Sequence, residues 1–450
     1  MGPTRTVGEM GDDGPVTPSA PAAPSLPRAS WGPDAATAAS LVVTTAAIWL
    51  VAKMVSTWAW VLLTGEYGDT YYYLTTAEGV SRAGGGVAEA FREYPTPAGL
   101  LLMLPYELGA THHDQYRAAI LVMTSLADAA FALLLGRRTG PLGVLAWVLL
   151  TSSLGQLALL RFDMLPAAVA GAAVLLAMEN RRVAASVLVG LGTGLKIWPI
   201  VLAPLAHRRG GWRAPLVALA ATGAALVAGS LAAGGWTRLL SPLGYQRDRG
   251  LQIEAVAATI PMHAWADDPA YRVWFSTFVA YEVVGTSVPT WLAVAQAASV
   301  VGALACVTLV GWWFWRGSDP AAIAWLALVL VGTFVVTSRA LSPQYLLWLA
   351  APTAVLVALA LRGGKQAPPL APALLTFAAV LVLCGLTLAI YPVHYDGLVN
   401  RGELTERALA FLTARNLGLL ALVAWSAACA IVVTNQGHSR QQLSENGVRG

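Results

Sequence analysis

The sequence predicts an all-α, polytopic membrane protein. Of its 450 residues, 57% are apolar and only 12% are charged, whereas a soluble domain is about 45–50% apolar and about 25% charged. The apolar residues form runs of roughly 20, the length a helix needs to cross a bilayer, and the runs lack the alternation of membrane-barrel strands. The composition therefore excludes a soluble enzyme and a nucleic-acid-binding module. The partner that it implies first is the lipid bilayer.

Twelve apolar segments account for this prediction. Ten read as spans, and they cover residues 38–63, 115–136, 141–160, 164–178, 214–234, 289–315, 320–338, 342–361, 369–391 and 416–434. Two more are interrupted by proline and glycine, which weaken a helix. Residues 94–108 are expected to dip into the membrane and return, and residues 183–206 are expected to form two half-helices in a hairpin. The expected architecture is a bundle of about 10–12 helices with re-entrant segments and extracytoplasmic loops.

The ends of the chain and its basic loops set the expected domain plan. Residues 1–34 are rich in Pro, Ala, Gly and Ser and are expected to form a disordered cytoplasmic tail. Residues 35–434 form the membrane domain, and residues 435–450 form a polar cytoplasmic C-terminal tail. Short basic loops mark the cytoplasmic side of a membrane protein, and here they are Arg137–Arg138, Arg181–Arg182, Arg208–Arg213, Arg316 and Arg362–Lys365. This orientation puts both termini in the cytoplasm.

The same orientation leaves an unusual number of charged residues on the outer side. The first outer loop, about 64–114, and the third, about 235–288, both carry Arg together with Asp and Glu. Arginine outside opposes the positive-inside tendency, so the set is expected to meet an anionic partner at the outer interface. The alternative is that these arginines pair with neighbouring acids and hold the loops together.

Asp69 is the candidate catalytic residue. It lies in the segment 65–74, directly after the first span, among Tyr residues that include Tyr73. A positioned carboxylate there can take the proton from a sugar hydroxyl as that oxygen attacks. The alternative is a helix cap or an ion-paired acid. Arg161 and Asp163 follow in a short outer turn, where their spacing favours a structural ion pair over a second base.

Several cations are candidates for a phosphate. Lys196 lies inside the apolar hairpin, where an ionisable side chain is costly and commonly functional; snorkelling to the interface is the alternative. Arg247 and Arg249 flank Asp248 before a flexible Gly, and Glu254 follows on the same segment. No metal site is expected, because His112 and His113 are adjacent and no acid cluster resembles a D-x-D motif.

Six segments in order carry a family resemblance. They are GEYGDTYYYL (65–74), REYPTPAGLLLMLP (92–105), RFDMLPA (161–167), GLKIWPIVLAPL (194–205), RDRGLQIEA (247–255) and SPQYLLWLAAP (342–352). Together they resemble glycosyltransferase family 87, the polyprenol-phosphate-mannose-dependent α-mannosyltransferases of the GT-C class. The resemblance covers most of the membrane domain.

The resemblance implies an extracytoplasmic active site and an inverting transfer. The donor would be a polyprenyl-phosphate sugar, usually mannose, and the acceptor a glycolipid or glycan of the cell envelope. Asp69 matches the family's general base in the first outer loop. Arg247, Arg249, Arg339 and Lys196 become candidate donor-phosphate contacts, and no cofactor is required. Candidate substrate contacts are Tyr73, Arg161, Asp163, Glu254, Gln344 and Tyr345.

One departure from the family leaves the acceptor open. Phosphatidylinositol-mannoside mannosyltransferases carry a His where this chain reads SPQYLLWL (342–349), which has none. Gln344, Tyr345 or Trp348 could contact the acceptor instead. Two alternatives also stay open: a transporter or flippase of an anionic lipid, since broken helices occur in transporters, and a GT-C enzyme that uses polyprenyl-phosphate arabinose or glucose.

Overall fold

The computed structural model describes residues 1–2, 35–64, 69–208, 211–364 and 366–448, and helices dominate it. The all-α membrane fold is therefore confirmed. Seven helical segments in these ranges are long and apolar enough to span a membrane. They are α4 (His113–Thr139), α9 (Arg213–Arg247), α11 (Val288–Trp315), α12 (Ile323–Thr337) with its leading turn η3 (Pro320–Ala322), α13 (Leu346–Arg362) with η4 (Pro343–Tyr345), α14 (Leu370–Leu388) with η5 (Ala389–Val393), and α16 (Thr405–Val448). The predicted tail 1–34 lies almost wholly outside the described residues.

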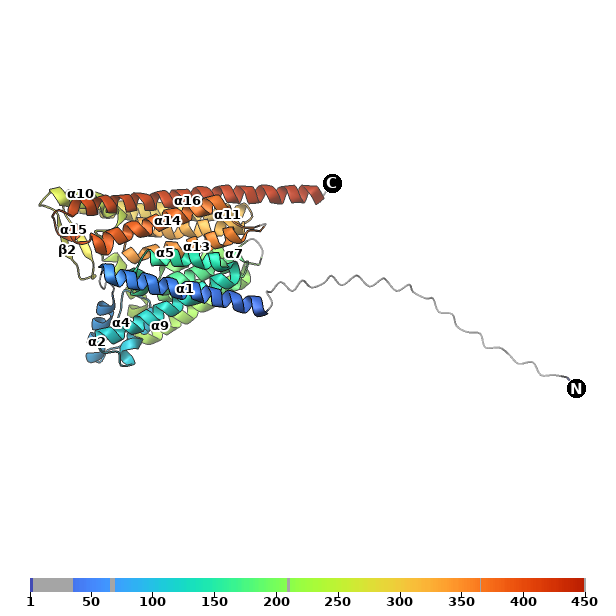
Figure 1. The fold of residues 1–450 in the computed structure, drawn as a ribbon, viewed down its shortest axis with the longest axis horizontal. Coiled ribbons are helices and arrows are strands. Elements are labelled where there is room, and N and C mark those ends of the chain that lie inside the picture. Colours follow the sequence, from blue (N-terminus) through green and yellow to red (C-terminus); the bar gives the residue numbers. More distant parts are fainter. Residues whose placement is uncertain (3–34, 65–68, 209–210, 365, 449–450) are drawn as a thin grey trace.

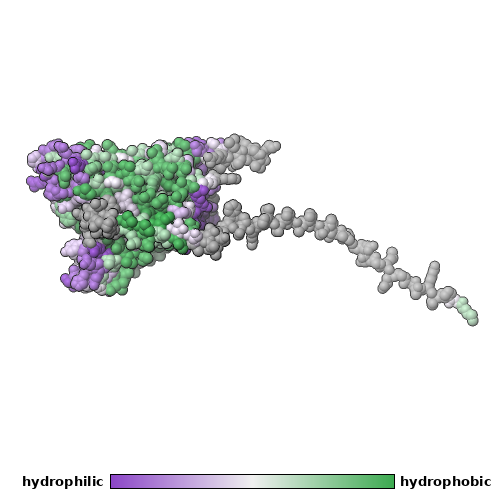
Figure 2. All heavy atoms as spheres, viewed as in Figure 1, coloured by the Kyte–Doolittle hydropathy of each residue, from purple (hydrophilic) through white to green (hydrophobic). Residues whose placement is uncertain are grey.

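Four shorter apolar helices complete the bundle. They are the 40–56 stretch of α1 (Ala35–Thr64), α5 (Pro141–Ser152), α7 (Met164–Met178) and α8 (Arg182–Leu195). Figure 2 shows an apolar belt between two hydrophilic ends, as expected of a protein surrounded by lipid. The chain is thus a multi-pass membrane protein.

The predicted outer loops gather at one end of the bundle. Figure 1 shows α2 (Thr70–Arg82), α10 (Thr259–Asp267), β2 (Arg272–Phe275) and α15 (Asp396–Val399) at this end, and the C-terminus at the other. We call it the loop end. The segments come from three distant parts of the sequence, and their meeting at one end agrees with the predicted alternation of spans.

Three predicted spans differ from the structure. The run 141–160 is not one span: α5 stops at Ser152 and a turn through Gly155 leads into the four-residue α6 (Gln156–Leu159). The run 214–234 continues as α9 to Arg247, with a kink where Gly235 has φ +65°, a conformation that favours glycine. The run 416–434 lies within α16, which starts at Thr405 and continues to Val448.

The two proline-interrupted segments form short elements. Residues 94–108 hold α3 (Thr96–Glu107). In the predicted hairpin, α8 ends at Leu195, Lys196 is extended (φ −155°, ψ 144°), and the 3-10 helix η1 (Trp198–Ala206) follows. Pro199 and Pro204 cannot donate backbone hydrogen bonds, so a regular α-helix is not expected there. The predicted break is confirmed, and it falls at Lys196.

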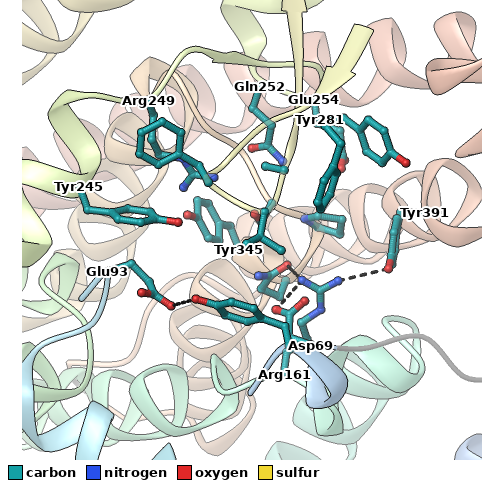
Figure 3. Close-up of a pocket in the computed structure, with 18 of the residues that line it drawn as sticks. Asp69, Glu93, Arg161, Tyr245, Arg249, Gln252, Glu254, Tyr281, Tyr345 and Tyr391 are labelled. Atoms are coloured by element: carbon teal, nitrogen blue, oxygen red, sulfur yellow. Dashed lines mark hydrogen bonds and ion pairs between the residues drawn. The ribbon is translucent and has the colours of Figure 1, made fainter. Parts of the chain in front are cut away.

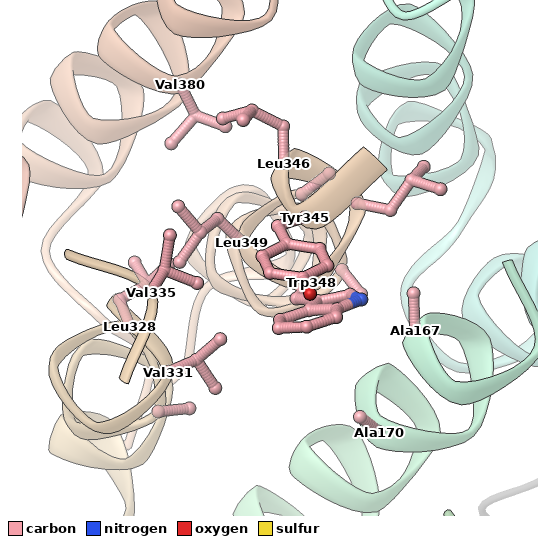
Figure 4. Packing of buried hydrophobic residues seen from close by; sticks show 14 of the residues in the cluster. Ala167, Ala170, Leu328, Val331, Val335, Tyr345, Leu346, Trp348, Leu349 and Val380 are labelled. Carbon is pink, nitrogen blue, oxygen red and sulfur yellow. The ribbon is translucent and has the colours of Figure 1, made fainter. Parts of the chain in front are cut away.

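Helix α13 is the centre of the core. All its residues from Leu346 to Ala360 are buried. Figure 4 shows Trp348 and Leu349 packed between Val331 of α12 and the small side chains of Ala167 and Ala170 on α7. Small residues let helices approach closely in a membrane. This packing fixes the start of α13, which faces the loop end.

A small sheet lies at the loop end. It contains β1 (Leu251–Gln252), β2 and β3 (Tyr281–Val284), antiparallel and in the order β1-β3-β2. Gln252 pairs with Glu282 of the central strand. The sheet holds the segment after α9 in an extended conformation.

A buried ion pair links three helices inside the bundle. Lys53 Nζ of α1 lies 2.9 Å from Asp128 Oδ2 of α4 and donates to Thr151 Oγ1 of α5 at 2.6 Å. Trp147 Nε1 donates to the other Asp128 oxygen at 2.5 Å. The Asp128 carboxylate is fully buried. Loss of the Lys53 ammonium would therefore leave a costly unpaired charge in the interior.

We predict that Lys53→Met destabilises the protein in detergent by roughly 3–5 kcal/mol, because Asp128 would be left charged and unpaired in the interior. Thermal unfolding of the purified variant measures the effect. The double variant Lys53→Met/Asp128→Leu removes both charges and should recover much of the loss. A double variant no more stable than the single one would contradict this reading.

Candidate functional site

A pocket of about 360 Å³ opens among the loop-end segments. Figure 3 shows polar and aromatic side chains converging on it from several elements. Its lining residues come from α2, the loop before α3, the α6–α7 turn, the α8–η1 break, the end of α9, the sheet, η4 and the α14–α15 region. The lining includes Asp69, Tyr72, Glu93, Tyr94, Arg161, Lys196, Tyr245, Arg249, Gln252, Glu254, Phe278, Tyr281, Gln344, Tyr345, Tyr391 and Tyr395.

Asp69 stands at the start of α2 and is held by Arg161. Arg161 Nη1 donates to Asp69 Oδ2 at 2.7 Å, and Tyr73 Oη donates to the same oxygen at 3.4 Å. The Asp69 side chain stays 26% exposed while that of Arg161 is 10% exposed. The carboxylate therefore faces the pocket with a cation behind it.

Arg161 also connects Asp69 to the opposite walls. It donates to Gln344 Oε1 and to Tyr391 Oη, each at 3.3 Å, and its guanidinium lies 5.5 Å from the Tyr391 ring centre. Burial alone would lower the pKa of the Arg161 guanidinium, but Asp69 together with Tyr391, Tyr73 and Asp163 outweighs this and raises it above its ordinary value. Arg161 is thus a fixed positive charge.

A second ion pair holds Lys196. Its Nζ donates to Asp163 Oδ1 at 2.7 Å, and Trp348 Nε1 donates to the same oxygen at 2.8 Å. The Lys196 ammonium lies 5.1–5.5 Å from the ring centres of Tyr94, Tyr345 and Trp348. Aromatic faces attract a cation, so the Lys196 charge is held at the pocket wall by one carboxylate and three rings.

Glu93 provides a second carboxylate in the pocket. Tyr72 Oη donates to its Oε1 at 2.5 Å. Burial raises the pKa of the Glu93 carboxyl, and the Tyr72 hydrogen bond offsets part of that rise. The pKa of Tyr72 is raised by burial and by the Glu93 charge, so the phenol stays protonated and remains a donor.

Arg339 forms hydrogen bonds with the backbone of the 247–252 segment. Its Nη1 donates to the carbonyl oxygens of Arg247 (2.9 Å) and Arg249 (3.2 Å), and its own carbonyl accepts from Gln252 N at 3.0 Å. Arg249 lines the pocket, with its guanidinium 5.9 Å from the Tyr245 ring centre. The Arg247 side chain instead is 82% exposed and pairs with Asp248. Arg339 therefore fixes the segment that presents Arg249.

Glu254 is fully buried beside an arginine from α16. Arg415 Nη1 donates to Glu254 Oε2, and Arg415 Nη2 donates to the Glu254 carbonyl, both at 2.6 Å. Asn416 Oδ1 accepts from the same guanidinium at 3.1 Å and 3.0 Å. This cluster connects the turn after β1 to α16.

The comparison with family models decides the class. The model of glycosyltransferase family 87 matches residues 94–343, more than half of the chain.

The chain belongs to glycosyltransferase family 87. It is therefore a membrane glycosyltransferase, and the enzyme interpretation holds over the transporter or flippase. No curated protein matches. Among solved structures, ArnT from Cupriavidus metallidurans bound to undecaprenyl phosphate is similar over 88% of this chain and 77% of that chain, with 15% identity and a TM-score of 0.43. The apo state of the same protein matches with 15% identity and a TM-score of 0.40.

Most of the predicted site residues of this family 87 enzyme meet at the pocket. Asp69, Lys196, Arg249 and the predicted substrate contacts Arg161, Glu254, Gln344 and Tyr345 line it. Four others do not. Tyr73 is buried behind Asp69, Asp163 is buried behind Lys196, Arg247 points outward, and Arg339 binds backbone.

One predicted pairing has different partners. The spacing of Arg161 and Asp163 suggested an ion pair between them, but Arg161 binds Asp69 and Asp163 binds Lys196. Asp163 directly precedes α7, and its buried side chain reaches Lys196 at the α8–η1 break. Each member of the turn thus joins a segment distant in the sequence.

Several pocket residues were not predicted as site residues. Glu93, Gln252, Tyr391 and the aromatic side chains of the sheet hairpin line the pocket, and Arg415 supports it from α16. Glu93 and Gln252 lie inside two of the six family-like segments, so that signal was present. No spacing pattern connects Tyr391 or Arg415 to the site. Within the described ranges, no three His, Cys, Asp or Glu side chains come together to hold a metal ion.

We predict that Glu93→Gln becomes more stable relative to the wild type as the pH rises from about 4 to about 7. The folded-state pKa of Glu93 is raised above its ordinary value, so its favourable contribution exists at low pH and is lost as the carboxyl ionises. The glutamine stays neutral and can still accept from Tyr72. Melting temperatures of both proteins across this pH range test the prediction. A melting-temperature difference that stays constant, or that shrinks as the pH rises, would contradict a destabilising ionised Glu93.

Proposed function

We propose that this family 87 enzyme transfers mannose from a polyprenyl-phosphate donor to an extracytoplasmic glycolipid or glycan acceptor. The observation that carries the proposal is the Asp69 carboxylate at a pocket that also holds Lys196 and Arg249. A base and separate cations are what a sugar transfer from a phosphate ester needs. Mannose and the kind of acceptor rest on the family resemblance.

Asp69 is the proposed general base. The acceptor hydroxyl oxygen attacks the anomeric carbon of the donor, its proton passes to Asp69, and the bond from that carbon to the phosphate oxygen breaks. Polyprenyl phosphate leaves with the bonding electrons. Attack from the side opposite the leaving group inverts the anomeric centre, so a β-linked donor gives an α-linked product.

Arg161 is the proposed positioning residue for this base. Its bond to Asp69 at 2.7 Å orients the carboxylate toward the acceptor hydroxyl. A substrate phosphate near Arg161 would compete with Asp69 for the guanidinium. Gln344 and Tyr391 hold the guanidinium in place as its partners change.

Lys196 and Arg249 are the proposed phosphate contacts. As the leaving group departs, the phosphate gains negative charge, and fixed cations stabilise that charge in the transition state. Lys196 is held by Asp163 and aromatic rings, and Arg249 is presented by a segment that Arg339 clamps. Little reorganisation is then needed during the reaction. The proposed acceptor contacts are Gln344 and Tyr345. Both line the pocket and lie in the segment 342–349, which lacks a His.

We predict that Asp69→Asn abolishes transfer from polyprenyl-phosphate mannose, with a loss of at least about 100-fold, in keeping with the contribution of general base catalysis. The variant should remain folded in membranes, because asparagine can still accept from Arg161. Asp114→Asn is the matched control: Asp114 is 86% exposed and pairs with Arg117 outside the pocket. Retained turnover in Asp69→Asn would remove Asp69 as the base.

We predict that the loop end faces away from the cytoplasm. Ala270 is exposed at this end and Gln366 is exposed between α13 and α14, while the three native cysteines are buried. In intact cells, a membrane-impermeant thiol reagent should label Ala270→Cys and should reach Gln366→Cys only after permeabilisation. The reverse pattern would invert the proposed topology and place the pocket in the cytoplasm.

A further inference from the structure

Two buried oxygen atoms in the pocket lack a hydrogen-bond donor. Gln252 is 4% exposed and Glu254 is fully buried, and both line the pocket. Among the described residues, neither Gln252 Oε1 nor Glu254 Oε1 has a hydrogen-bond partner. A buried acceptor without a donor costs about 1–3 kcal/mol. The two atoms are therefore well suited to accept from a ligand that enters the pocket.

A turn directly after β1 brings both acceptors to the pocket. Ala255 donates its backbone N–H to the Gln252 carbonyl at 3.0 Å and closes the turn over residues 252–255. Ile253, between them, is buried and donates its backbone N–H to the carbonyl of Tyr281 at 3.1 Å. Figure 3 shows Gln252 and Glu254 entering from the sheet side of the pocket.

The position of Arg249 selects the donor sugar over the acceptor. Arg249 lies three residues before Gln252 on the segment that Arg339 clamps at both ends. A phosphate at Arg249 would bring its attached sugar next to Gln252 and Glu254. The cation and the two acceptors would then contact the two halves of one sugar phosphate.

The environment of both acceptors is rigid. Glu254 Oε2 is held by Arg415, which leaves only Oε1 for a ligand. The backbone of Gln252 is fixed by Arg339 and by its pairing with Glu282. A fixed acceptor loses little entropy when it binds a hydroxyl, which favours discrimination between sugars.

We propose that Gln252 and Glu254 form a recognition subsite for the donor sugar, in which Oε1 of each accepts a hydrogen bond from a ring hydroxyl. This inference rests on the proposed function, since it takes the donor to be a lipid-linked sugar phosphate. On this proposal, residues on the sheet side of the pocket recognise the sugar, and Asp69 on the other side takes the proton. Glu254 also pairs with Arg415, so its removal would disturb folding; Gln252 is the residue to test.

The test compares two lipids on purified protein in detergent: polyprenyl-phosphate mannose and the same polyprenyl phosphate without sugar. Gln252→Met fills a similar volume but has no acceptor. We expect it to weaken binding of the mannosyl lipid about tenfold, the usual worth of one such hydrogen bond, and to leave binding of the sugar-free lipid within about twofold. Gln115→Met, at an exposed position of α4 outside the pocket, should change neither.

Deoxymannosyl lipids identify the hydroxyl involved. For one of them, the wild type and Gln252→Met should bind equally, because the donor of the lost hydrogen bond is already absent. Gln252→Asn keeps the amide but shortens its reach. It should also weaken binding of the mannosyl lipid and leave binding of the sugar-free lipid unchanged. Agreement between the two variants would exclude a folding defect specific to the methionine variant.

Three results for Gln252→Met would overturn the subsite. The variant could bind both lipids equally more weakly than the wild type, it could bind the mannosyl lipid as tightly as the wild type, or it could lose the full tenfold in affinity for every deoxymannosyl lipid. A wild-type protein that binds neither lipid would instead contradict the proposed function. The two failures are thus distinguishable.

Discussion

The site depends on two ion pairs, each of which contains a buried charge. The Asp69–Arg161 and Lys196–Asp163 ion pairs lie where the helical bundle meets the loop end, at 2.7 Å each. An unpaired charge at such a place is costly, so each pair fixes two segments relative to each other. Together they join the start of α2, the α6–α7 turn and the α8–η1 break. The pocket is the space that these joined segments leave open.

The rest of the fold supplies irregular backbone at that level. Helix α8 ends at Leu195, α9 kinks at Gly235, and η4 turns the chain into α13. In a membrane protein, such interruptions are tolerated where they are buried in protein or line a cavity. The packed core of α7, α12 and α13 lies next to these interruptions and supports the site. Trp348 belongs to this core and also donates a hydrogen bond to Asp163.

The sequence supported the fold better than the details of the site. Long apolar runs predicted the membrane class, and glycines and prolines predicted that residues 183–206 are interrupted, because both signals are local. The structure places that break at Lys196. The partners of Arg161 and Asp163 could not be predicted from spacing, since the turn into α7 directs them to different segments. Arg339 and Arg415 share this property: their roles depend on backbone carbonyls and a carboxylate contributed by residues far away in the chain. Arginine composition alone cannot separate a phosphate contact from a backbone clamp.

A structure of the enzyme with polyprenyl-phosphate mannose bound would show directly how the pocket holds the donor. We expect the lipid phosphate to lie within hydrogen-bond distance of Arg249 and Lys196, with the anomeric carbon facing Asp69. A phosphate bound at Arg247 or outside the pocket, or an anomeric carbon turned away from Asp69, would contradict this expectation.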